Sequence, residues 1–199
     1  MLKTLPGATV EVDISNPQAA DDILSSLFLT GGLMLSQVSQ FTGLEPHTIQ
    51  NWVKRGFLPP PQNKRYDRSQ LCRILIIHML KDTLALPTIC RLLSYINGQL
   101  DKNSDDSIDD SQLYLYIIRV VFSLENDKLE GLSHLEERCR QVLEGYREPF
   151  AGARDRVLLV CLLYTSYSAC VLWKARNFIY NTKSYIFVIF CKTEKKAAP

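Results

Sequence analysis

The residues best suited to chemistry in this sequence are seven basic side chains between Pro46 and Lys81. They are Lys54, Arg55, Lys64, Arg65, Arg68, Arg73 and Lys81. The stretch contains a single acidic residue, so its net charge is +6, whereas the whole chain carries only +2. A concentrated positive patch attracts phosphate backbones, although a basic face turned only to solvent is also common. The sequence therefore predicts a polyanionic partner.

Two short amphipathic helices are expected to position the first of these side chains. Apolar residues recur along 35–41 at helical spacing, and Thr42 and Gly43 then end the helix. A second helix is expected over 46–55, because proline is accepted in the first turn of a helix. Its apolar positions leave the polar and basic side chains on the opposite face, and Trp52 is expected in the core.

The spacing within this pair of helices is that of a helix-turn-helix. Ser39 lies where the two helices would touch, Gly43 takes the positive-φ position of the turn, and Ile49 supplies the apolar residue that follows. In such a motif the second helix enters the major groove of DNA.

Loops and two further helices follow. The consecutive prolines at 59–61 exclude a helix, so a loop or small hairpin is expected. Asp67 or Ser69 can cap a third helix that runs to about residue 83 and is mostly buried, and a fourth helix is expected over 86–96.

Three segments within Leu33–Ile96 resemble one known family. They read L-M-L-S-Q-V-S-Q-F-T-G-L-E-P-H-T-I-Q-N-W-V-K-R-G-F-L-P-P-P, K-R-Y-D-R-S-Q-L and L-A-L-P-T-I-C-R-L-L. Together they resemble the winged helix-turn-helix of the MerR family of bacterial regulators. With the acidic stretch and S-Q-L-Y that follow, the sequence is also similar to a smaller, uncharacterised bacterial family of MerR-like proteins, a domain of unknown function.

The resemblance implies a sequence-specific, DNA-binding regulator of transcription. In the family, the segment matching 56–59 leads into a wing, and Arg65 and Tyr66 match its Arg-Tyr pair. Gln50 and Asn51 depart from the family's usual Arg-Tyr, so the operator of better-known members cannot be transferred. Both amides can still read adenine in the major groove.

The expected partner is double-stranded DNA. The predicted DNA-binding residues are His47, Thr48, Gln50, Asn51, Lys54, Arg55, Lys64, Arg65, Tyr66 and Arg68, of which Arg68 is a weaker candidate, as is Arg73. The wing residues 64–66 are expected to project toward phosphates and the minor groove. A protein-interaction adaptor that keeps the fold without binding DNA is the alternative.

The expected fold class is all-α with a small β wing. Its parts are an N-terminal extension (1–32), a DNA-binding domain (33–100), an acidic loop (101–111), a helical dimerisation or core region (112–180) and a tail (181–199). A homodimer is expected through the apolar helix 112–124 and the heptad-like seam 129–143. The alternative is that these helices close the core of a monomer.

Other functions receive little support from the sequence. The scattered cysteines form no C-x-x-C pair, the first 16 residues lack the pattern of a signal peptide, and the uncharged run 157–173 fits a buried helix better than a membrane span. We therefore expect a cytoplasmic protein with reduced thiols. No enzyme motif, metal site or cofactor site is recognised, and an imperfect calcium-loop pattern at 101–112 lacks the required glycine and final glutamate.

Overall fold

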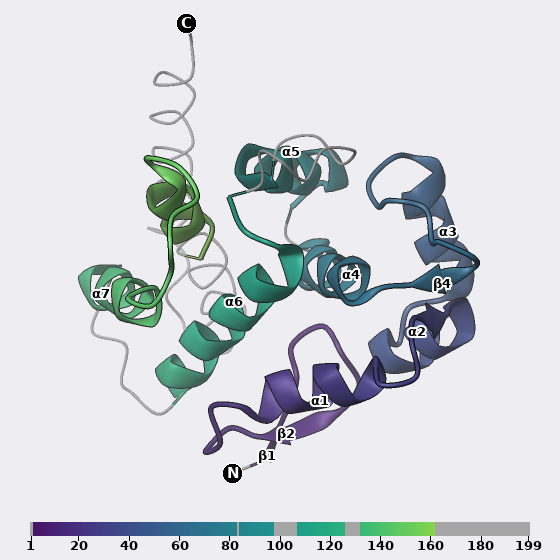
Figure 1. Cartoon of the computed structure of the whole chain (residues 1–199), viewed down its shortest axis with the longest axis horizontal. Coiled ribbons are helices and arrows are strands. Elements are labelled where there is room, and N and C mark those ends of the chain that lie inside the picture. The colour runs from purple at the N-terminus through teal and green to yellow at the C-terminus, as the bar shows by residue number, and fades with distance from the viewer. Residues whose placement is uncertain (1, 83, 98–106, 126–131, 162–199) are drawn as a thin grey trace, which may run out of the picture.

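The computed structural model describes residues 2–82, 84–97, 107–125 and 132–161, and this part of the chain is mostly helical with two small antiparallel sheets (Figure 1). In chain order the elements are β1 (Leu2–Thr4), β2 (Glu11–Asp13), α1 (Ala19–Leu27), β3 (Leu33–Met34), α2 (Leu35–Thr42), α3 (Pro46–Lys54), β4 (Arg65–Tyr66), α4 (Arg68–Leu80), α5 (Leu86–Asn97), α6 (Asp110–Glu125) and α7 (Leu132–Val142). Residues 153–161 are also helical. The predicted predominance of helix is confirmed.

Helix α4 is the central element of the fold. Every side chain from Gln70 to Ile77 is buried, and α6 packs against α4 more extensively than any other element does. The helix begins with a capping box: the Asp67 carboxylate accepts from the Gln70 backbone N–H at 2.8 Å, and the Gln70 side chain accepts from the Asp67 N–H at 2.9 Å. The predictions of a mostly buried helix and of its Asp67 cap are both confirmed.

Helices α2 and α3 are joined by a turn of three residues. Gly43 ends α2 with a φ of 72°, a conformation that favours glycine, and Pro46 begins α3. The Ser39 hydroxyl donates to the Leu44 carbonyl at 2.6 Å and so holds the turn against the last part of α2. The predicted ends of these two helices are therefore confirmed.

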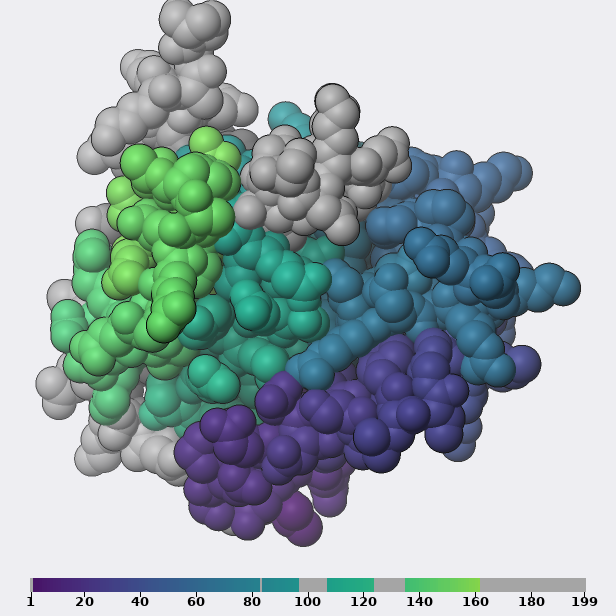
Figure 2. Space-filling model, viewed as in Figure 1, coloured from purple at the N-terminus to yellow at the C-terminus, as the bar shows by residue number. Residues whose placement is uncertain are grey.

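The N-terminal residues 2–27 are part of the same core. Figure 2 shows them, in purple, packed along the teal and blue residues of the later helices. The Thr9 N–H donates to the Phe41 carbonyl at 2.8 Å, and the Tyr114 hydroxyl donates to the Pro6 carbonyl at 2.7 Å. Gly7 has a φ of 77°, and a Cβ there would lie 2.9 Å from the Leu75 carbonyl oxygen. The extension therefore packs closely on α2, α4 and α6.

The apolar surfaces expected to form a dimer are buried within this chain. Leu135, Cys139 and Leu143 lie in the core, and α7 packs against α6. On α6 itself, which begins two residues earlier than predicted, Leu113 and Ile117 are buried as well. Where their side chains are described, these helices thus close the core of the chain itself, which is the alternative that the sequence left open; residues 129–131 of the predicted seam lie outside the described residues.

Some predicted features lie outside the described residues. They are most of the acidic loop (101–106), the predicted helix beyond residue 161 and the tail 181–199. Among the helices that the structure describes, none is long and apolar enough to cross a membrane.

Candidate nucleic-acid interface

The outer face of α3 carries most of the predicted base-reading and phosphate-binding side chains. Ile49 and Trp52 point into the core, as predicted, so the periodicity of the helix turns the intervening residues outward. The exposed polar residues of this segment are His47, Gln50, Asn51, Lys54 and Arg55, and Thr48 is half-buried. The result is a polar face with its basic residues at the C-terminal end, where they also complement the helix dipole.

A hairpin over residues 62–66 follows α3 and carries the next two basic residues. Gln62 and Arg65 form an antiparallel bridge, and the Arg65 N–H donates to the Gln62 carbonyl at 2.8 Å. The two residues between them, Asn63 and Lys64, have φ values of 50° and 62°. Positive φ at both central residues is the requirement of a type I′ turn, for which Asn-Gly is the favoured pair. Lys64 is exposed at the tip of this hairpin.

Lys64 occupies a backbone conformation that is unfavourable for a residue with a β-carbon. The left-handed region costs such a residue about 1–2 kcal/mol, and glycine would avoid that cost. A side chain kept at such a position often serves a function, and here the side chain adds a positive charge to an exposed tip.

The β4 strand explains why the two residues after Lys64 behave differently. Successive side chains of a strand point to opposite faces. Arg65 is exposed and donates to the Gly32 carbonyl at 2.6 Å, whereas Tyr66 is only 3% exposed and packs in the core. Burial raises the pKa of the Tyr66 phenol. The prediction that Tyr66 projects from the wing is therefore wrong.

The two weaker candidates both form ion pairs within the chain. Arg68 forms an ion pair with Asp21 of α1 and donates to the Ser25 hydroxyl at 3.0 Å. Arg73 is only 3% exposed and pairs with Asp110 at 3.0 Å. Arg73 is thus not available to a phosphate, and a DNA contact from Arg68 would compete with Asp21.

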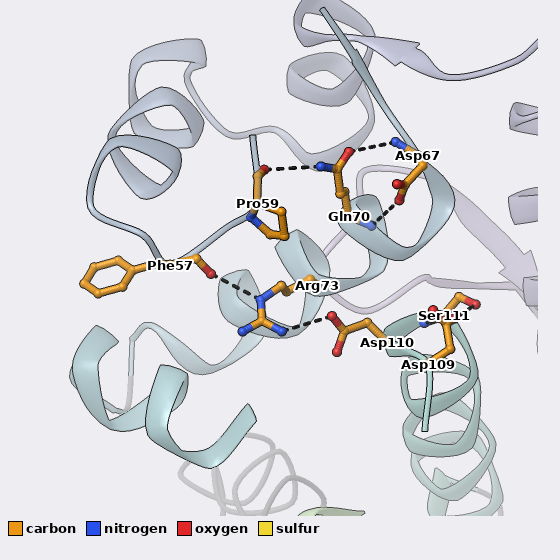
Figure 3. A network of polar contacts seen from close by, with 8 residues as sticks. All are labelled: Phe57, Pro59, Asp67, Gln70, Arg73, Asp109, Asp110 and Ser111. Atoms are coloured by element: carbon orange, nitrogen blue, oxygen red, sulfur yellow. Dashed lines mark hydrogen bonds and ion pairs between the residues drawn. The ribbon is translucent and has the colours of Figure 1, made fainter. Parts of the chain in front are cut away.

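A polar network joins residues 57–60, which follow α3, to the start of α4 and the start of α6 (Figure 3). Residues 56–61 connect the end of α3 to the hairpin, and the carbonyls of residues 57, 59 and 60 accept hydrogen bonds from buried side chains of α4. The Arg73 Nε donates to the Phe57 carbonyl at 3.2 Å, and the Gln70 Nε2 donates to the Pro59 and Pro60 carbonyls at 3.2 and 3.0 Å. The sequence-based predictions do not include this network. The available signal was that Gln70 and Arg73 are the only polar residues in the stretch 70–77 of α4.

The cysteines and acidic residues form no recognisable metal centre in the part of the chain that is described: no three His, Cys, Asp or Glu side chains gather there. Cys72 is fully buried on α4, and burial raises the pKa of its thiol. Cys90 is half-buried, and burial raises its pKa as well. Both thiols are therefore protonated at neutral pH.

Comparison with known proteins finds a family match over this region. Residues 27–117 match the family described as Domain of unknown function (DUF1836). The matched span begins at the end of α1 and ends within α6, so it contains α3, the hairpin, Arg73 and Asp110. Residues 2–26, which pack on it, lie outside the match.

The chain is also similar to the uncharacterised protein YkrK of Bacillus subtilis (strain 168). The two are 27% identical over 128 residues, covering 61% of this chain and 54% of YkrK. The chain thus spans about half the length of that relative. No solved structure matches the chain significantly.

Proposed function

We propose that this protein is a sequence-specific DNA-binding regulator of transcription of MerR-like type that acts in the bacterial cytoplasm. In this proposal α2 and α3 form a helix-turn-helix with α3 as the recognition helix, and the 62–66 hairpin is the wing. The observation that carries it is the exposed polar and basic face of α3, followed by a hairpin with Lys64 exposed at its tip and Arg65 exposed on β4. Such a pair of elements matches the major groove and the adjacent backbone of DNA.

The side chains divide into two roles. Gln50 and Asn51 lie exposed on α3 and are the candidate base readers, because an amide can form two hydrogen bonds to adenine. The phosphate contacts are assigned to His47, Thr48, Lys54, Arg55, Lys64 and Arg65. Phosphate contacts supply most of the affinity and set the register, whereas base contacts supply sequence preference.

A homodimer remains part of the proposal. One module reads few base pairs, so two-fold pairing on a near-palindromic operator is the usual arrangement. Because the described apolar faces of α6 and α7 are buried in the chain's own core, the dimer contact would use other surfaces.

The test is a DNA-binding titration on duplexes selected from a random library, measured by fluorescence anisotropy at several salt concentrations. We expect the logarithm of the affinity to fall linearly with the logarithm of salt. The double variant Lys64→Ala, Arg65→Ala should weaken binding to all sequences about equally. It should also reduce the salt slope by about 0.9 for each phosphate that the variant no longer neutralises.

A control variant removes two positive charges near α7 instead of from the hairpin. The double variant Arg140→Ala, Arg147→Ala removes the same charge from exposed positions near α7. It should leave the slope unchanged. A slope near zero in the unmodified protein, or equally weakened binding in the two double variants, would refute a DNA interface on α3 and the hairpin.

The second candidate is a protein-interaction adaptor, and one observation favours it. Leu29 is 82% exposed and Met34 is 52% exposed, and Met34 is the cross-strand partner of Arg65. An exposed apolar side chain next to the hairpin, as Met34 is, can contact a protein partner. The same titration separates the two functions, since an adaptor shows no sequence preference for DNA.

A further inference from the structure

We propose that Arg73, held by Asp110, is a positioning residue that sets where the 56–61 connection lies between α3 and the hairpin. It thereby determines how the two DNA-contacting elements are placed relative to each other. The consequence for DNA binding rests on the proposed function, whereas the consequence for the connection itself does not.

The connection needs partners because of its sequence. Prolines at 59–61 have no N–H groups, so these three residues can offer only carbonyls to the rest of the protein. Leu58 is buried, which brings the backbone close to α4. The carbonyls of residues 57, 59 and 60 accept part-buried hydrogen bonds, and the donors are the side chains of Arg73 and Gln70.

Both donors lie on one face of α4. Gln70 and Arg73 are three residues apart, so their side chains are neighbours on the helix surface. Gln70 is 6% exposed and is itself fixed by the capping box with Asp67. The Gln70 amide therefore has little freedom to move with residues 56–61. The Arg73 guanidinium is held in the same way, because its Nε and Nη1 are both bound (Figure 3).

The Asp110 carboxylate stabilises the buried guanidinium of Arg73. A buried cation without a countercharge is strongly unfavourable. The Asp110 carboxylate lies 3.0 Å from the Arg73 Nη1, and it is the first residue of α6, where the helix dipole also favours a negative charge. Asp110 thus orients Arg73 so that its Nε points at the Phe57 carbonyl.

The connection bears directly on the geometry of the proposed interface. Gly56 has a φ of 72° and ends α3, and β4 is anchored by its pairing with β3. The position of residues 57–60 therefore influences where the C-terminal end of α3, with Lys54 and Arg55, lies relative to the hairpin. A shift there would disturb simultaneous contact of both elements with one duplex.

The decisive variant is Arg73→Lys in the full chain. Lysine retains the positive charge for Asp110 but lacks the rigid fork that reaches a second acceptor, so it separates ion pairing from the hydrogen bond to Phe57. Arg73→Met and Asp110→Asn are companion variants. Leu143→Ala, which truncates a buried side chain at the end of α7, is the control for a general decrease in stability.

Two measurements are made on each variant under conditions where it is folded. The first is amide hydrogen exchange, in which the Gly56 and Phe57 N–H groups report on the connection through their bonds to the Val53 and Trp52 carbonyls. The second is affinity for a selected duplex and for a random one. For Arg73→Lys we expect exchange at both amides to rise about tenfold, and affinity for the selected duplex to fall by about the same factor. Affinity for random DNA should change less than about twofold, because phosphate attraction remains.

The opposite outcomes overturn the inference. Exchange at Gly56 and Phe57 that stays at the unmodified rate in Arg73→Lys shows that Arg73 does not position the connection. A uniform rise over the whole chain, as expected for Leu143→Ala, assigns Arg73 to general stability. If the unmodified protein binds no DNA, the proposed function fails, and the exchange measurement alone decides the role of Arg73.

Discussion

Replacing Lys64 with glycine should make the protein more stable and a weaker DNA binder at the same time. The φ of 62° at Lys64 costs a residue with a β-carbon about 1–2 kcal/mol. Glycine avoids this cost but adds freedom to the unfolded chain, which offsets roughly 0.4–1 kcal/mol. The net gain is about 0.5–1 kcal/mol, and for a chain of this length the midpoint of thermal unfolding should rise by about 1–4 °C.

The effect on DNA binding follows from the removal of one charge. One phosphate contact fewer reduces the slope of log affinity against log salt by about 0.9. Lys64→Ala removes the same charge but keeps a β-carbon in the unfavourable conformation. It should therefore match Lys64→Gly in salt slope without gaining stability.

Calorimetry or circular dichroism gives the unfolding midpoints, and anisotropy titrations at several salt concentrations give the slopes. Equal midpoints for the glycine and alanine variants would refute the backbone argument. Unchanged slopes in both variants would show that Lys64 contacts no phosphate, whatever its effect on stability.

Three further predictions concern base reading, pH and the role of α6. Gln50→Ala or Asn51→Ala should reduce discrimination between selected and random duplexes by about 1–3 kcal/mol, and unchanged discrimination in both variants would place specificity elsewhere. Burial lowers the pKa of His78 below 6.5, so the folded state favours the neutral imidazole. The free energy of unfolding should therefore fall as the pH decreases below 6.5. In urea titrations over this pH range, the His78→Gln variant should lose less stability than the unmodified protein, and an equal loss would contradict the role of His78. Asp110→Ala at the start of α6 removes the carboxylate partner of the buried Arg73 and should destabilise the full chain by about 3–5 kcal/mol, and an unaltered urea midpoint would contradict the importance of this ion pair.

The ends of the helices around the candidate site could be predicted because the signals are local. Gly43 ends α2, Pro46 begins α3 and Asp67 caps α4, each for reasons contained within a few neighbouring residues. The inward and outward faces of α3 follow from its period. The sequence therefore sufficed to place Gln50 and Asn51 on an exposed face.

What could not be predicted depends on contacts between distant residues. The partners of Arg68 and Arg73 lie 47 and 37 residues away, so no local pattern distinguishes these arginines from exposed ones. The orientation of Tyr66 depends on the register of a two-residue strand, and a shift of one residue would reverse it. The heptad-like spacing of α7 fits an intramolecular neighbour as well as a second subunit, and packing against α6 occupies it here.

The hydrogen bond from Tyr114 to Pro6 also governs the order in which the protein can fold during synthesis. It joins residues 108 positions apart, so the N-terminal segment cannot complete its packing until α6 has left the ribosome. About 45 residues separate the ends of α4 and α6, which corresponds to roughly 2–9 s of translation. For that interval the apolar circumference of α4 lacks its main partner and is exposed to chaperones and proteases. The helices proposed to bind DNA therefore rest on a core that is completed only after α6, a helix that is assigned no DNA contact, has been synthesised.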